Sequence, residues 1–343
     1  MDVTQRTAEI KKEPSLASSC VTVQDTIGYN SWSFVQAIGT TLVCVYSRGL
    51  EHSIAETCRG VYARISHDGG QTWQPESTVV NTTDDCESAI GKGLDEKGAM
   101  LLWVRCIGEK RWHHDLFRSA DGVAFERIAT LELSPMPMQI TDVFHVEGVG
   151  LMSLWFSGHY RNEPENSWGT LVSRDNGMTW EQTTIEDSLL KGDWPTEPSC
   201  VVLGDDRLFA VARAERRADG APSRQFQLQS EDNGRTWRKF RTNIDDVSES
   251  TPSLILGKNE MIWNYYYQRG AGLLKRRVVN VSDVWDNPTN WPEPEIVCIG
   301  SDNAHHAGNV NVCVFGDRHA CTFYSGDERQ TDVKLVLAET SCN

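Results

Sequence analysis

The chain of 343 residues has no long apolar runs. No window approaches 18 uninterrupted apolar residues, so we expect no membrane insertion. The first 20 residues also contain no apolar signal-peptide core. This favours a cytoplasmic location, or secretion if a leader has been removed.

Positive charge is also scarce. The chain has 33 Lys and Arg against 48 Asp and Glu, a net charge of −15. Because Lys and Arg must neutralise phosphates when a protein binds nucleic acid nonspecifically, this balance argues against a nucleic-acid partner. An anionic small molecule is compatible with it, since a local arginine cluster can oppose the global field.

Paired cysteines are missing too. The ten cysteines are scattered singly, without C-x-x-C pairs or the Cys/His spacing of zinc sites. We therefore expect reduced, mostly buried thiols, no metal site and no cofactor.

Helical periodicity is scarce, and a short motif recurs instead. Ser-x-Asp-x-Gly-x-Thr-Trp is written three times, as SHDGGQTW (66–73), SRDNGMTW (173–180) and SEDNGRTW (230–237). A degenerate fourth copy, the worn copy, lies at Ser119–Phe125, and Ser282–Asp283 is a candidate fifth copy. The aspartates are then 53, 54, 57 and 51 residues apart, which indicates an internal repeat.

Each repeat contains alternating apolar runs of strand length separated by turns, the pattern of a four-stranded antiparallel meander. A meander of about 54 residues matches one blade of a β-propeller. We therefore predict an all-β, single-domain six-bladed β-propeller over residues 1–343. Its blades start near residues 31, 86, 139, 197, 252 and 309. Residues 1–30 are predicted to form an N-terminal extension and the outer strand that closes the ring.

The motif itself is predicted to be structural. Asp in a tight turn accepts backbone N–H bonds, Gly adopts positive φ and Trp packs inward between blades. We interpret Asp68, Asp175 and Asp232 as turn staples, meaning side chains whose hydrogen bonds hold a turn closed, rather than as catalytic groups.

Binding chemistry is expected where the first and second strands of the blades converge near the axis. The second strands end in four arginines and two other polar residues, namely Arg48, Arg105, Arg213, Arg269, His159 and Tyr324. Because guanidinium groups bind carboxylates through paired hydrogen bonds, this pattern predicts a carboxylate-bearing ligand.

The repeated motif resembles the Asp boxes of the sialidase (neuraminidase) superfamily, whose members are six-bladed propellers. The copies span nearly the whole chain. The resemblance implies a glycoside hydrolase that cleaves a sialic acid or related acidic sugar from a glycan, with arginines holding the sugar carboxylate.

By resemblance, the segment EPSCVVLGDDRLFAVAR carries the family's glutamate and one of its arginines, here Glu197 and Arg213. The family's next arginine corresponds to Arg276 in GLLKRRVVNVS, with Arg277 and Arg269 as rivals. These arginines would hold the substrate carboxylate, and Glu197 would act beside the nucleophile.

The first blade departs from the family pattern twice. The segment SWSFVQ replaces an Arg-Ile-Pro motif, and Arg48 is the candidate that compensates. The loop GLEHSIAETCRG has no aspartate to act as the general acid. It offers Glu51, His52 and Glu56 as proton carriers, and we favour Glu56.

The last blade departs from the pattern as well. It opens with DNAHHAGNV, so the nucleophilic tyrosine of the family is missing there. Tyr267 is a candidate nucleophile, and His306 and Tyr324 are candidate binding residues. The endo-acting sialidases of bacteriophages resemble this reduced pattern, which would suit a phage-associated protein.

Two other functions stay open. A polysaccharide lyase acting on an acidic glycan would use His and Tyr beside an arginine, and residues 159–161 (His-Tyr-Arg) are the best local example. A non-catalytic propeller that binds glycan or protein would also contain Asp boxes, since these occur in non-enzymes.

Overall fold

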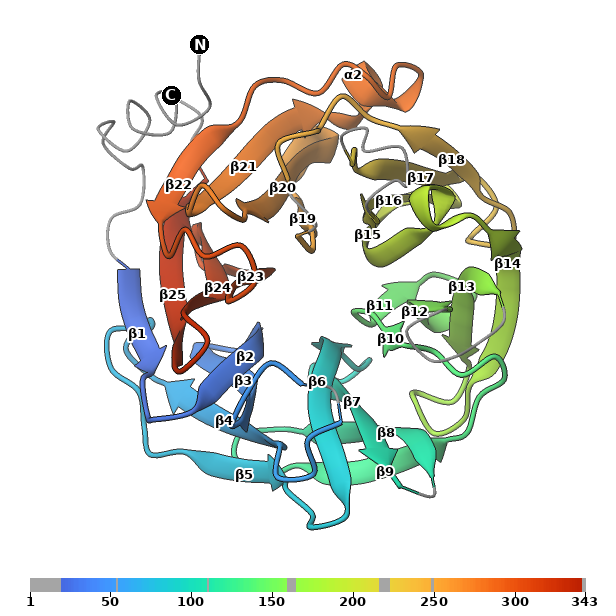
Figure 1. The fold of residues 1–343 in the computed structure, drawn as a ribbon. Coiled ribbons are helices and arrows are strands. Elements are labelled where there is room, and N and C mark those ends of the chain that lie inside the picture. Colours follow the sequence, from blue (N-terminus) through green and yellow to red (C-terminus); the bar gives the residue numbers. More distant parts are fainter. Residues whose placement is uncertain are drawn as a thin grey trace.

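The computed structural model describes residues 20–53, 55–109, 111–158, 165–215, 223–247 and 250–340. In these ranges the chain is all-β, and its antiparallel sheets are arranged around a common axis (Figure 1). The predicted all-β fold of four-stranded antiparallel sheets is confirmed. No helix in these ranges is long and apolar enough to cross a membrane.

Consecutive strands pair with one another, as the alternating apolar runs predict. Three sheets have four strands each: β6 (Asp85–Leu94), β7 (Met100–Gly108), β8 (Trp112–Ser119) and β9 (Glu126–Leu131); β15 (Pro195–Gly204), β16 (Arg207–Ala214), β17 (Phe226–Ser230) and β18 (Arg238–Arg241); β19 (Ser253–Leu256), β20 (Met261–Gln268), β21 (Leu273–Asn280) and β22 (Glu295–Ile299). A fourth sheet has five strands: β10 (Gln139–Ile140), β11 (Phe144–Val146), β12 (Gly150–Ser157), β13 (Asn166–Ser173) and β14 (Glu181–Leu189). The two short strands β10 and β11 both pair with β12 at its inner edge.

The first and last strands of the described chain share one eight-stranded sheet. Its members are β1 (Cys20–Gln24), β2 (Tyr29–Ile38), β3 (Thr41–Gly49), β4 (Gly60–Ser66), β5 (Ser77–Val80), β23 (Ala307–Phe315), β24 (Arg318–Gly326) and β25 (Thr331–Glu339). Strand β1 pairs antiparallel with β25. Strand β2 joins β25 through the single parallel pair of Tyr29 with Thr331. The N-terminal strand therefore lies beside the C-terminal strand (Figure 1).

The apolar core lies between neighbouring sheets. Val45 of β3 shares one cluster with Val104 of β7, and Phe209 of β16 shares another with Tyr266 of β20. All four side chains are fully buried. Because a neighbouring sheet covers each face, β7 is buried along its whole length, and its apolar residues do not alternate with exposed ones.

Polar side chains join neighbouring sheets near the axis. In the described ranges, five of them accept a backbone N–H of a neighbouring inner strand at 2.9–3.1 Å, and we call these bonds the edge links: Ser47 with Ala89, Ser199 with Leu254, Ser253 with Val312, Asn311 with Val35, and Asp142 with Lys92. The bond of Asn311 with Val35 joins β23 to β2 within the eight-stranded sheet, and the other four join different sheets. Within the described ranges, the backbone pairing of an inner edge with another sheet is limited to the isolated bridge of Gly93 in β6 with Val143. The edge links therefore satisfy N–H groups that would otherwise be buried without a partner.

The repeated motif forms tight turns after β4, β13 and β17, as predicted. In the second copy, Asp175 Oδ1 accepts Thr179 N at 2.8 Å and Oδ2 accepts Thr179 Oγ1 at 2.6 Å. Trp180 then packs against Trp103 of β7 in the neighbouring sheet, with ring centroids 5.0 Å apart. The aspartate is thus a turn staple, and the tryptophan is a contact between sheets.

Glycine is required at the turn of the first copy. Gly70 has φ of +84°, and a Cβ at this position would lie 2.3 Å from Leu335 Cδ2 of β25. A larger residue would therefore strain the turn and clash with the neighbouring strand.

The two degenerate copies behave differently. Asp121 accepts the N–H groups of Val123 and Ala124 at 2.8 and 3.0 Å, so the worn copy keeps its turn. The candidate fifth copy at Ser282–Asp283 is wrong, because these residues lie in the short helix α2 (Val281–Trp285). Asn280 caps this helix by accepting Ser282 N at 3.0 Å. Two short 3-10 helices, η2 (Lys191–Asp193) and η3 (Lys258–Glu260), lie in the connections.

Replacing Asp175 by Ala should lower the melting temperature by a few degrees at neutral pH, because Thr179 loses its hydrogen-bond acceptor. Bonds from Thr179 hold the pKa of Asp175 at about 2, below its ordinary 3.8. The carboxylate therefore stabilises the fold above about pH 4, and this contribution is lost as the pH falls toward 2. Calorimetry across this range should show wild type and variant converging in acid. The control is Asp317→Ala, whose side chain is 95% exposed. Equal melting of Asp175→Ala and wild type at pH 7 would contradict the staple.

Candidate functional site

Three inner strands share one irregularity near their beginnings. Trp32 in β2, Glu197 in β15 and Asn309 in β23 each have φ of +49°, which residues other than glycine rarely adopt. At each of them the pairing register with the next strand shifts, as in a β-bulge. Bulges re-aim side chains, and all three of these line one cavity near the axis.

The cavity has a volume of about 240 Å³ and combines an apolar wall with charged groups. The apolar wall includes Trp32, Phe34, Met138 and Phe156. The polar and charged lining includes His52, Arg105, Glu197, Arg213, Glu215, Arg269 and Asn309. This composition suits a ligand with both an apolar face and an anionic group.

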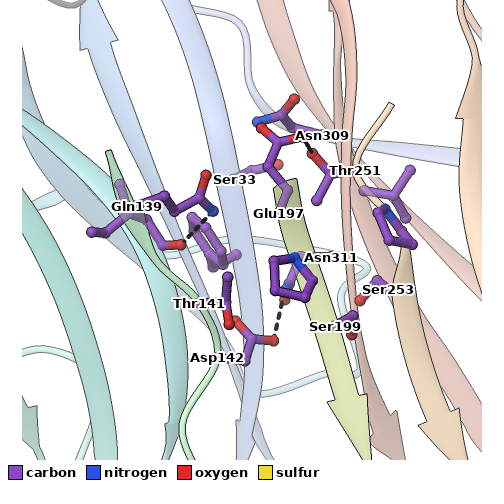
Figure 2. A pocket seen from close by; sticks show the side chains of 15 residues that line it. Ser33, Gln139, Thr141, Asp142, Glu197, Ser199, Thr251, Ser253, Asn309 and Asn311 are labelled. Atoms are coloured by element: carbon purple, nitrogen blue, oxygen red, sulfur yellow. Dashed lines mark hydrogen bonds between the residues drawn. The ribbon is translucent and has the colours of Figure 1, made fainter. Parts of the chain in front are cut away.

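A smaller cavity of about 30 Å³, with a mixed polar and apolar lining, shares Glu197 and Asn309 with the first (Figure 2). Thr251 Oγ1 donates to Glu197 Oε2 at 2.9 Å, and Asn311 Nδ2 donates to Asp142 Oδ2 at 3.2 Å. Glu197 therefore lies between the two cavities, and Thr251 fixes its carboxylate.

Arg213 lies between two carboxylates. Its Nη1 is 3.0 Å from Glu197 Oε2, and its Nη2 is 2.9 Å from Glu215 Oε1. The side chains of Arg213, Glu197 and Glu215 are 15, 12 and 2% exposed, so water screens these pairs only weakly. Glu197 and Arg213 are both candidates from the sequence, whereas Glu215 is a site residue that the sequence did not point to. Strand alternation was the available signal, since Glu215 comes two residues after Arg213 and so shares its side of the strand.

Arg105 and Arg269 have only neutral partners within the described ranges. Arg105 Nη1 donates to Met138 O at 2.9 Å, and burial lowers the pKa of Arg105 to about 10. Arg269 Nε donates to Ala307 O at 2.8 Å, and its Nη2 lies 3.3 Å from the Tyr324 hydroxyl. These two guanidinium groups therefore give the cavity positive charge that no hydrogen-bonded carboxylate offsets.

His52 lies in an aromatic cluster at the rim of the cavity. Its ring stacks on Tyr29 with centroids 5.4 Å apart and planes 9° apart, and Trp32 lies 5.6 Å away. The Tyr29 hydroxyl and His306 Nδ1 are 3.0 Å apart. Burial first, and then nearby charges such as Arg269, lower the pKa of His52 from 6.5 to about 4. His52 is therefore neutral at physiological pH.

Two of the binding candidates lie beside the cavity. His306 contacts the Tyr29 hydroxyl, and the Tyr324 hydroxyl contacts Arg269, but neither residue is part of the lining. His159 lies outside the described residues.

Four candidates lie away from the lining, each engaged elsewhere. Arg276 Nε donates to Glu295 Oε2 at 2.7 Å, and the Tyr267 hydroxyl donates to Ser301 O at 2.7 Å. The rival Arg269 occupies the cavity in place of Arg276.

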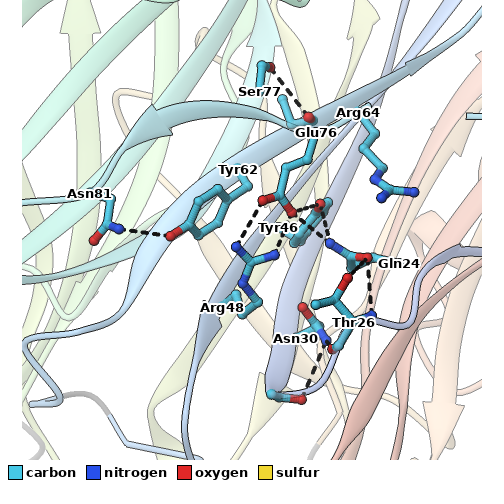
Figure 3. Close-up of polar contacts among 12 residues, drawn as sticks. Gln24, Thr26, Asn30, Tyr46, Arg48, Tyr62, Arg64, Glu76, Ser77 and Asn81 are labelled. Carbon is cyan, nitrogen blue, oxygen red and sulfur yellow. Dashed lines mark hydrogen bonds and ion pairs between the residues drawn. The ribbon is translucent and has the colours of Figure 1, made fainter. Parts of the chain in front are cut away.

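The remaining two candidates, Glu56 and Arg48, make contacts within the β2–β5 part of the eight-stranded sheet and its loops. Glu56 Oε1 accepts Leu50 N at 2.6 Å, and Arg59 Nη2 lies 3.1 Å from Glu56 Oε2, so this carboxylate orders its own loop. Arg48 forms a two-point ion pair with Glu76 at 2.6 and 2.9 Å, in the polar network of Figure 3. Within the loop that was expected to supply a proton carrier, His52 is the residue that lines the cavity.

Solved structures with the same fold include several sialidases. A protein of unknown function from Dyadobacter fermentans matches with a TM-score of 0.71 at 12% identity, covering 94% of this chain and 100% of that one. The sialidase of Trypanosoma rangeli in complex with sialic acid matches with a TM-score of 0.68 at 12% identity, covering 94% of this chain and 57% of that one. The NanB sialidase of Streptococcus pneumoniae matches with a TM-score of 0.68 at 11% identity, covering 97% of this chain and 72% of that one.

At these identities the structural matches show the fold alone. No curated protein matches the sequence. The family model for the BNR repeat-like domain matches residues 41–304, which include the three complete copies of the Ser/Asp motif. With this match over most of its length, the chain belongs to the BNR repeat-like domain family.

Proposed function

We propose that this chain is a sialidase-like glycoside hydrolase that cleaves a sialic acid or related acidic sugar from a glycan. The observation that carries the proposal is the convergence of Arg105, Arg213 and Arg269 on one cavity. They lie on or directly after strands of three different sheets, β7, β16 and β20. Separate sheets thus hold three guanidinium groups in fixed positions before any ligand binds.

The proposal includes a closed ring of six blades in a single domain. Dividing the eight-stranded sheet at the single pair of Tyr29 with Thr331 leaves one unit of β2–β5 and one of β23–β25 with β1. Together with the four other sheets these make six. In this arrangement β1 is the outer strand of the last blade and closes the ring through β25.

The ligand carboxylate is assigned to Arg105 and Arg269. Glu197 and Glu215 already offset the charge of Arg213, whereas Arg105 and Arg269 have neutral partners within the described ranges. A carboxylate placed between them would make charge-assisted hydrogen bonds in a largely buried site, where these bonds are strong. The apolar wall at Trp32 and Phe156 would cover a sugar face.

The same cavity offers groups for the reaction. Cleavage of a glycosidic bond develops positive charge on the sugar ring, which the carboxylates of Glu197 and Glu215 would stabilise. Neutral His52 would accept a proton, a role that its low pKa permits at physiological pH. Asn309 occupies the bulge at the opening of β23, and an amide cannot act there as the nucleophile.

A second candidate is elimination on a uronate-containing polysaccharide. It is supported by the arrangement of neutral His52 stacked on Tyr29 and of the Tyr324 hydroxyl 3.3 Å from Arg269. An arginine that neutralises the uronate carboxylate makes the adjacent C–H more acidic, and a neutral imidazole can remove that proton. As this proton leaves, the bond between the β carbon and the glycosidic oxygen breaks, and the departing oxygen takes up a proton to become a hydroxyl. The remaining sugar then has a carbon–carbon double bond conjugated with the carboxylate, which absorbs in the ultraviolet.

The test measures turnover of a fluorogenic α-sialoside, then of polysialic acid and of uronate polymers. We expect Arg269→Ala to lower kcat/KM by about 100-fold or more, because the carboxylate loses a charged donor in a buried site. The matched control is Arg238→Ala, since Arg238 is 51% exposed and pairs with Glu231. Arg213→Ala is a poorer test, because it would leave Glu197 and Glu215 uncompensated and destabilise the fold.

The products separate the two candidates. Free acidic sugar without ultraviolet absorbance supports the hydrolase, and an absorbing unsaturated product from a uronate polymer supports elimination. If Arg269→Ala turns over as fast as Arg238→Ala on every active substrate, the assignment of the carboxylate to Arg269 is wrong.

The low pKa of His52 is also testable. In an NMR titration of the imidazole nitrogens, assigned with His52→Gln, we expect a midpoint near the pKa of about 4. Arg269→Ala should raise this midpoint, because Arg269 is the largest charge opposing protonation. A midpoint near the ordinary value of 6.5 would contradict the proposal that His52 is a base that is neutral throughout the physiological pH range.

A further inference from the structure

A second group of reactive side chains lies on the opposite face of β7 from Arg105. Cys106 of β7 faces His113 of β8 and Glu87 of β6 directly across the sheet, so the three form one row over three adjacent strands. Asp115 follows His113 by two residues and lies on the same face. These four residues form the β6–β8 cluster, which packs against the sheet that contains β3 and β4.

The cluster is buried and its atoms are close together. Glu87, Cys106, His113 and Asp115 are 0, 2, 6 and 2% exposed. Asp115 Oδ2 lies 3.9 Å from Cys106 Sγ and 3.7 Å from His113 Nε2. One ligand atom from each of these three residues lies within 4.8 Å of the other two. Tetrahedral zinc places its S, N and O ligand atoms about 3.3–3.6 Å apart, so the two distances to Asp115 Oδ2 exceed the zinc-bound spacing by a few tenths of an ångström.

Two buried polar atoms in the cluster have no hydrogen-bond partner within the described ranges. They are His113 Nδ1 and Glu87 Oε2. Glu87 Oε1 is held by Thr82 N at 3.0 Å, which leaves the second oxygen available. Burying two carboxylates beside a thiol is costly unless a cation compensates them. Glu87 lies outside the group of ligand atoms that Cys106, His113 and Asp115 bring together, so its carboxylate adds negative charge near the site and is not one of the three ligands.

The surroundings also orient the cluster. Thr130 Oγ1 donates to Asp115 Oδ1 at 2.6 Å, which directs Oδ2 toward Cys106 and His113. Such outer contacts are typical of metal ligands. One cation already faces the cluster, since Arg127 Nη1 lies 3.3 Å from Asp115 Oδ2. The side chain of Arg127 is 60% exposed, so it can move into solvent when a metal binds.

From this arrangement we propose that Cys106, His113 and Asp115 bind one zinc-class transition-metal ion in a structural site. The thiolate and imidazole favour Zn(II) over Mg(II) or Ca(II). Burial raises the pKa of the Cys106 thiol, so the metal must displace its proton when it binds. The ion would clamp β7 to β8 on the face opposite the cavity and so hold Arg105 in place. The proposal does not depend on the proposed function.

The spacing Cys-x6-His-x-Asp explains why the sequence analysis predicted no metal. It matches none of the paired zinc spacings, and the ligands meet only because β7 and β8 pair in this register. Cys44 on β3 is a buried cysteine that lies apart from any such cluster in the described ranges.

The test uses the full-length reduced protein, stripped of metal with a chelator. We expect it to take up one equivalent of Zn(II) and to melt at a higher temperature with the metal. With Co(II), we expect a thiolate-to-metal charge-transfer band. Cys106→Ser should abolish the band and weaken Zn(II) binding by at least about 100-fold. The buried thiol variant Cys44→Ser should keep both.

His113→Gln provides a second variant in case Cys106→Ser does not fold. This variant should lose tight Zn(II) binding. Its thiolate-to-metal band should be altered or absent. Substoichiometric Zn(II) uptake by the wild type overturns the proposal. So does a band that survives Cys106→Ser, or Zn(II) binding that is as tight in His113→Gln as in wild type.

Discussion

Side-chain bonds to the backbone N–H groups of neighbouring inner strands hold these strands together, and the cavity depends on them. An unpaired buried N–H costs about 1–3 kcal/mol, so each edge link removes a penalty as well as adding a contact. Two of them lie next to site residues, since Ser199 follows Glu197 by two positions and Asn311 follows Asn309 by two. The bulges that aim Glu197 and Asn309 are thus anchored to neighbouring inner strands, β19 and β2.

The charge of the cavity is arranged against that of the whole chain. The protein has a net charge of −15, yet three arginines converge on this one site. Glu197 and Glu215 compensate Arg213, which makes this arginine a fixed part of the wall. Arg105 and Arg269 are instead held by neutral oxygens, so they are positioned without being neutralised. Such preorganised positive charge is what recognition of an anionic sugar requires.

Strand β7 illustrates how one blade element serves two purposes. Successive side chains of a strand point to opposite faces, so Arg105 reaches the cavity while Cys106 joins the β6–β8 cluster. The packing of Val104 against Val45 holds the strand between these two sites.

The repeats and their apolar alternation were enough to predict the all-β fold, the four-stranded sheets and the structural role of Asp68, Asp175 and Asp232, because these depend on local pairing and turn chemistry. Glu197, Arg213, Arg105 and Arg269 were also identified from the sequence, since strand ends recur at regular positions. Only the tertiary structure could place His52 and Glu215 at the cavity, Glu56 and Arg276 away from it, and Cys106 beside Asp115. These outcomes depend on φ at single residues, on pairing register and on which hydrogen-bond partner lies within reach of a side chain. None of these is encoded in local spacing.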